Sequence, residues 1–261
     1  MTNHTTTRAT NPRRWSSVVL TTAALALVPV PAISQEARIW TVAEGGEGGE
    51  AGAVADASAD VAYLAQLAIV EGHLLAARDL YAKGAVDEAI GLSYHPEAEM
   101  MDAVRETLIA HNAPDITPAM TAFSQTLEAA APLPTVEAAL AEVRAAIAVA
   151  TAAGNQRLRF DAIALLVKAA AHEYAESIEG GTVSDVMAYH ESHAFIETAG
   201  LWLAELAKAE PTKAAAEKAI SALAAASEAY GDMSGMNLQA RDPAILAAVA
   251  ARVELSAGQV R

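Results

Sequence analysis

The sequence predicts an all-α protein, a helical bundle of about eight helices arranged in two packed layers or repeats. Apolar residues recur at spacings of three or four, as they do on one face of an α-helix. Alanine, the strongest helix former, is abundant. After residue 34, β-branched and aromatic residues never alternate with a period of two over five or more positions, so strand signals are nearly absent.

Glycines and prolines separate the expected helices. Gly84 ends the first helix, and Pro96 and Pro118 suit first helical positions, where the missing N–H costs no hydrogen bond. The first helix carries one core stripe, made of Tyr63, Leu67, Val70, Leu74, Ala77 and Tyr81. The expected helices are residues 59–83, 96–110, 117–131, 135–153, 156–179, 185–209 (beginning at Ser184 or Asp185), 212–229 and 243–255.

The N-terminal residues have the pattern of a targeting segment. Residues 1–34 contain an Arg-bearing start, an apolar run over 18–30 and a small-residue exit at Ser34, which predicts a secretory signal peptide. The run is too short to span a bilayer, so we expect an exported, periplasmic chain with no membrane insertion after cleavage. Arg13-Arg14 leaves the general and twin-arginine routes open. Residues 35–58 read as a flexible acidic Gly/Glu/Ala linker, and 59–261 as the helical domain.

Charge and the absence of cysteine exclude several classes of function. The formal net charge is −15, and loss of residues 1–34 would leave 14 basic and 32 acidic residues, a net charge of −18. Such a surface argues against binding to nucleic acid or to anionic membranes, and it is compatible with metal cations or basic partner proteins. Without Cys there is no thiolate, iron–sulfur or Cys-type zinc site, so His, carboxylate and Met remain as ligands.

One group of candidate ligands follows Tyr94. His95, Glu99, Asp102 and Glu106 have spacings of i, i+4, i+7 and i+11, which place them on one side of the helix expected from Pro96. An imidazole and three carboxylates suit a cation, but a solvated acidic face has the same pattern. His73 reads as a core histidine unless His95 lies alongside it.

A second group lies in the sixth expected helix. His190, His193 and Glu197 share one face at i, i+3 and i+7. The preceding helix carries His172 and Glu176, and its short turn to the sixth predicts antiparallel neighbours. The two helices could supply a non-sulfur metal site, while solvated His/Glu pairs remain the alternative.

Catalytic signatures are missing from the sequence. No HExxH, ExxH pair, G-x-S-x-G, P-loop or strand-linked G-x-G-x-x-G occurs. We therefore expect a protein that is not an enzyme.

Two segments resemble known exported proteins. GHLLAARDLYAKGAVDEAIGLSYHPEAEM resembles exported bacterial helical proteins of unknown function that carry GHL, Leu-Tyr and Gly, then HP followed by an acid. HEYAESIEGGTVSDVMAYHESHAFIETA supports a similarity to the periplasmic segment that precedes oxidase-coupled high-affinity iron permeases. The resemblance covers about residues 60–110 and 160–205, and it implies functional pairs at Glu173-Tyr174 and Tyr189-His190. Leu92 departs from it, because a histidine is expected there.

Together these observations lead to two hypotheses. The first is a periplasmic transition-metal-binding accessory protein, iron-handling by the resemblance, which acts beside a membrane metal transporter. Its ligands are His73, His95 and Glu99, with Glu173 (from the resemblance), His190 and His193. Iron, copper and zinc all remain open as the metal. The second hypothesis is a metal-free helical scaffold or interaction protein of the cell envelope.

Overall fold

Helices make up most of the chain in the computed structural model, which describes residues 54–152, 155–233 and 237–260. These residues all belong to one compact unit. The α-helices are α2 Ala59–Ala82, α3 Val86–Ser93, α4 His95–Glu99, α5 Met101–Ala110, α6 Thr117–Glu128, α7 Leu133–Ala150, α8 Gln156–Glu176, α9 Val186–Leu206, α10 Glu210–Leu223, α11 Ser227–Tyr230 and α12 Ala244–Ala257. Eight of these described helices have ten or more residues, which confirms the predicted all-α fold.

The predicted N-terminal segments fall largely outside this description. The signal peptide, residues 1–34, lies outside the described residues, as does the linker from 35 to 53. Both remain predictions.

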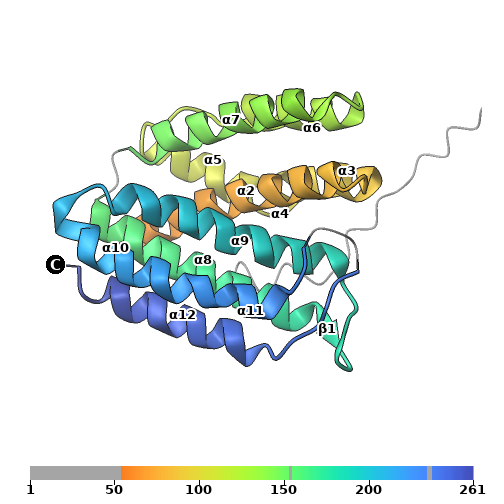
Figure 1. The fold of residues 1–261 in the computed structure, drawn as a ribbon. Coiled ribbons are helices and arrows are strands. Elements are labelled where there is room, and N and C mark those ends of the chain that lie inside the picture. Colours follow the sequence, from red (N-terminus) through yellow and green to blue (C-terminus); the bar gives the residue numbers. More distant parts are fainter. Residues whose placement is uncertain (1–53, 153–154, 234–236, 261) are drawn as a thin grey trace, which may run out of the picture. The chain divides into compact units, whose positions relative to one another are not determined.

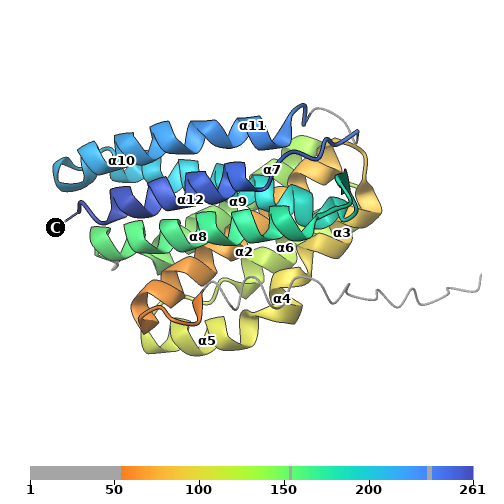
Figure 2. The ribbon, with the colours of Figure 1, turned by 90° about the horizontal axis from the view of Figure 1, so that it is seen from below.

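Helix α2 lies at the centre of the described bundle. It contacts α7, α3 and α5, and it also packs against α8 and α9. Figure 1 shows α6 and α7 on one side of α2 and the C-terminal helices on the other, and Figure 2 shows the same bundle turned by 90°. The predicted stripe of α2 is buried except for Tyr81, and several neighbouring positions are buried too, because helices surround α2.

Among the described helices, α2 alone is long and apolar enough to cross a membrane, and 78% of its apolar window is buried inside the protein. Burial of this kind is typical of a core helix.

The C-terminal helices form a bundle of their own. Helices α8, α9, α10 and α12 pack on one another, and η1 (Ala224–Ala226) and α11 connect α10 toward α12. Three buried tyrosines, Tyr174, Tyr189 and Tyr230, meet with ring centroids 5.3–5.5 Å apart. The hydroxyls of Tyr174 and Tyr189 donate to the backbone carbonyls of Ala229 and Tyr230, so these tyrosines fix α11 to the bundle.

The prediction of one helix over 96–110 is wrong. The structure has α4 and α5 separated at Met100, whose φ of −137° is not helical, and it adds α3 where a loop was expected. In one unbroken helix Val104 would lie about half a turn around from His95. The break lets Val104 reach the core and leaves Asp102 exposed, so Asp102 and Glu106 do not share a face with His95.

The predicted end of the fifth helix is also too late. Helix α8 ends at Glu176, and a short antiparallel hairpin of β1 (Ile178–Glu179) and β2 (Thr182–Val183) follows. Gly180 and Gly181 turn it with φ of +59° and +81°, a backbone region that favours glycine. Asp185 then caps α9 by accepting a hydrogen bond from the Ala188 N–H, as the sequence predicts.

Candidate metal centre

His73 is held in the core where α2 and α9 approach closely. Its side chain is 1% exposed, and its ring meets the Phe195 ring edge-on at 5.4 Å. The neighbouring Gly72 makes this contact possible, because a Cβ there would lie 2.3 Å from a Phe195 ring carbon. The close packing of glycine against phenylalanine therefore fixes the position of the imidazole.

His95 reaches the same place from a different segment. It is the first residue of α4, and the buried Pro96 follows it at the helix start. The His95 ring centroid lies 6.1 Å from that of His73, and its side chain is 16% exposed. The structure thus brings together two of the histidines that the first hypothesis names as ligands of one site.

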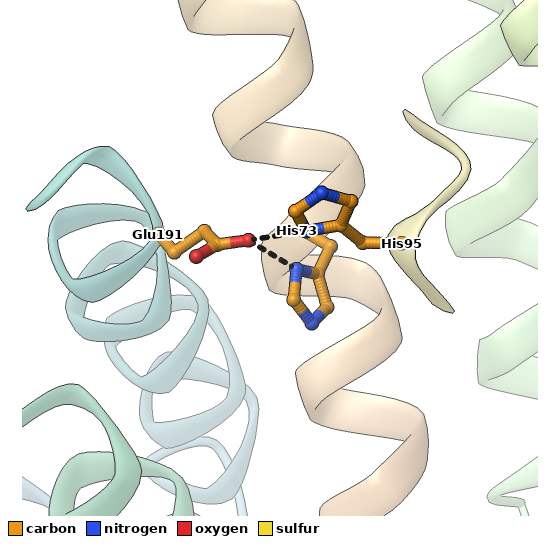
Figure 3. Close-up of side chains that lie close together, drawn as sticks. All are labelled: His73, His95 and Glu191. Atoms are coloured by element: carbon orange, nitrogen blue, oxygen red, sulfur yellow. Dashed lines mark hydrogen bonds and ion pairs between the residues drawn. The ribbon is translucent and has the colours of Figure 1, made fainter. Parts of the chain in front are cut away.

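Glu191 of α9 faces both imidazoles. Its Oε1 lies 2.9 Å from Nδ1 of His73 and 3.2 Å from Nδ1 of His95, as the dashed lines in Figure 3 show. The predicted ligand Glu99 lies at the edge of this group, with its Oε1 3.8 Å from Nδ1 of His95. Three separate helices therefore supply one imidazole–carboxylate cluster.

The charge of Glu191 is stabilised despite its burial. Burial raises the pKa of this carboxyl, but the facing imidazoles of His73 and His95 outweigh it and lower the pKa to about 2. The carboxylate is therefore ionised at neutral pH, which is the form that can bind a cation.

The donor geometry fits a transition-metal ion. The ligand atoms of His73, His95 and Glu191 all lie within 4.8 Å of one another. Ligands about 2.1 Å from an ion at tetrahedral or octahedral angles are separated by about 3.0–3.4 Å, close to the two measured N–O distances. Two imidazoles and one carboxylate are a ligand set used for Fe(II), and zinc and copper also accept imidazole.

A second cluster joins α2 and α9. It contains Asp79, His193 and Glu197, whose ligand atoms also lie within 4.8 Å of one another. Burial lowers the pKa of His193, an effect that Asp79 opposes and Lys83 reinforces, so a neutral imidazole is favoured. His193 therefore lies in a different cluster from the His73–His95 pair with which it was grouped.

Two predicted ligands lie in neither cluster. Glu173 and His190 are both buried, at 2% exposure each, but the described structure groups neither with His73 and His95. On α9, residues 190 and 191 point about 100° apart, so when Glu191 faces His73 its neighbour His190 faces elsewhere. Glu191, and neither Glu173 nor His190, shares the described ligand group with His73 and His95, so a part for Glu173 and His190 in the first site stays a prediction.

Glu191 was missed because a sequence pattern along one helix could not reveal it. It has no histidine three or four residues away, and its two partners come from α2 and α4. The only local signal was its place between His190 and His193.

The comparisons with known proteins agree with one of the two resemblances. Residues 150–258 match the model of the iron permease-associated 4-helix bundle domain, which confirms the similarity to the iron-permease segment over this part of the chain. The matched part contains α8 to α12 and hence Glu191, whereas His73 and His95 precede it. No curated protein and no solved structure matches the chain.

Proposed function

We propose that this chain, whose C-terminal part matches the iron permease-associated bundle, is an exported transition-metal-binding protein that handles iron beside a membrane transporter. The metal is its cargo, and the protein is not an enzyme. His73, His95 and Glu191 hold the ion, and Glu99 lies at the edge of the site. The observation that carries the proposal is the convergence of two imidazoles from separate helices on one buried carboxylate.

Charge balance supports a cation at this place. In the metal-free protein the facing imidazoles of His73 and His95 offset the charge of the buried Glu191 carboxylate, but as metal ligands they must be neutral and no longer cancel it. A divalent ion would do so, and Glu99 would bring the group close to neutrality. The excess of acidic residues over the whole chain also attracts cations.

The choice of iron rests on two supports of different kinds. The ligand set of two imidazoles and one carboxylate suits Fe(II), although it admits zinc and copper. The family description supplies the preference for iron and the link to a transporter. Export is supported by the pattern of residues 1–34.

The test is metal binding by the purified chain and its variants. Stripped protein titrated with Co²⁺ or, without oxygen, with Fe²⁺ is expected to bind one ion tightly. Loss of a residue that hydrogen-bonds to a metal ligand lowers metal affinity by about 10–100-fold. Loss of a ligand itself, in His95→Gln or Glu191→Gln, should therefore weaken metal binding by about 100-fold or more. His172→Gln, which removes an exposed histidine of α8, is the matched control.

Equal affinity in His95→Gln, Glu191→Gln and the unsubstituted chain would refute this function. It would favour the second candidate, a metal-free helical scaffold. The specific observation in favour of that candidate is that both Nδ1 atoms already lie within hydrogen-bonding distance of Glu191, so the three groups can stabilise the core without an ion. In that case the variants would lower the melting temperature equally with and without metal.

A further inference from the structure

Asp79, His193 and Glu197 form a cluster that the proposed function does not use. Asp79 lies in the last turn of α2, and His193 and Glu197 are one turn apart on α9. Nδ1 of His193 lies 3.9 Å from Oε2 of Glu197, and Asp79 offers a carboxylate oxygen within 4.8 Å of both. No residue of this cluster belongs to the first candidate site.

We propose that Asp79, His193 and Glu197 form a second site for a divalent first-row transition-metal ion, which binds more weakly and exchanges faster than the ion at His73, His95 and Glu191. The proposal goes beyond the proposed function, because it depends on other side chains and can hold or fail separately.

The chemistry of the three donors suits such an ion. Two carboxylates and one imidazole offer hard oxygen and intermediate nitrogen ligands, a combination that Fe²⁺, Mn²⁺, Co²⁺ and Zn²⁺ accept. The end of α2 adds a further attraction, because the helix dipole places partial negative charge at a helix C-terminus and Asp79 lies in the last turn of α2.

One nitrogen of a buried imidazole beside the cluster has no hydrogen-bond partner in the described part of the chain. His190 is 2% exposed, and its Nε2 has no hydrogen-bond partner among the described residues. It precedes His193 by three residues, which places it on the same side of α9. Buried polar atoms are nearly always satisfied, so this nitrogen is available to an ion or to a water bound to one.

Positive charges and solvent explain why this site should be the weaker. Nη1 of Arg78 lies 3.1 Å from Oδ1 of Asp79 and competes with an ion for that oxygen. The charge of Lys83, at the end of α2, acts on Asp79, His190 and His193. The side chain of Glu197 is 44% exposed, whereas that of Glu191 is 7% exposed. An ion here is therefore opposed by two cations and is partly open to water.

Equilibrium dialysis of the full chain against Zn²⁺, followed by elemental analysis, tests the proposal. The expected result is two ions per chain, bound in two steps of different affinity. Asp79→Asn or Glu197→Gln should weaken the second step at least tenfold and leave the first unchanged. Glu191→Gln should do the reverse, so failure of one site is distinguishable from failure of the other. Glu176→Gln, an exposed carboxylate of α8, is the matched control.

A gain of affinity provides a test that does not depend on the stability of these variants. Lys83→Gln removes a positive charge from the cluster and should tighten the second step by about threefold to tenfold, with the first step unaffected. Tightening would support the proposal. A single Zn²⁺ per unsubstituted chain, or a second step that neither Glu197→Gln nor Lys83→Gln alters, would overturn it.

Discussion

Glu191 is the residue on which both imidazoles of the first site converge. One of its oxygens lies within hydrogen-bonding distance of His73 and His95, and its low pKa keeps it ionised. Without an ion the rings donate their Nδ1 protons to it. With an ion those nitrogens must lose the protons and become ligands, so metal competes with protons for the same atoms.

His190 makes the stability of the metal-free protein depend on pH. Burial, with smaller contributions from Lys83 and His193, lowers the pKa of His190 from 6.5 to about 4. The unfolded chain therefore binds more protons than the folded one between these values, and stability falls as the pH drops from 6.5 toward 4. At pH 5 the loss from this residue is about 2 kcal/mol relative to pH 7.

Urea unfolding in EDTA at pH 7 and pH 5 measures this effect. His190→Gln should reduce the difference in unfolding free energy between the two pH values, whereas the exposed-site control His172→Gln should keep it. An identical pH dependence in the unsubstituted chain and His190→Gln would show that His190 is not buried in its neutral form.

The residues themselves were predictable only in part. His73 and His95 were candidates because an imidazole near a core stripe and an imidazole at a helix start are visible in one dimension. Their partner Glu191 was not a candidate, because no sequence periodicity links residues of α2, α4 and α9. His193 and Glu197 were correctly placed on one face, but Asp79 from α2 completes their cluster and no local pattern selected it.

At the scale of elements, the contact between α2 and α9 sets the distances in both clusters. Gly72→Ala would place a Cβ 2.3 Å from the Phe195 ring. Either the ring must move or α2 and α9 must separate. Overpacking of this kind costs about 1–3 kcal/mol, and metal affinity at the first site should fall with it, because His73 and Glu191 lie on the two helices being separated.

The melting temperature and the Co²⁺ affinity of Gly72→Ala check this prediction, with Gly200→Ala as the control. A Cβ at Gly200 would lie 3.5 Å from Leu223, an ordinary contact, so that variant should be neutral or slightly stabilised. If Gly72→Ala keeps both its stability and its metal affinity, the close packing does not position the site.

Local sequence predicts some helix boundaries and not others. The Asp185 cap and the Gly84 stop were readable from residue type, because each satisfies or releases backbone groups locally. The division of 95–110 into α4 and α5 could not be predicted from residue type, since it depends on the burial of Pro96 and Val104 in the folded protein. Tertiary packing therefore favours a break between α4 and α5 over one continuous helix.

For the whole molecule, helix class and core followed from periodicity and from the abundance of alanine. The mutual placement of the helices did not follow, and the candidate sites depend on it. The first site combines His73 and His95, which precede the family match, with Glu191 inside it. The proposed iron handling therefore belongs to the entire helical domain and requires both parts of it.

Anomalous diffraction from crystals of the full chain loaded with Zn²⁺, recorded at the zinc absorption edge, shows where the ion binds. We predict a peak about 2.0–2.2 Å from Nδ1 of His73, Nδ1 of His95 and Oε1 of Glu191. Absence of a peak there, at a Zn²⁺ concentration that occupies other positions on the protein, would contradict it.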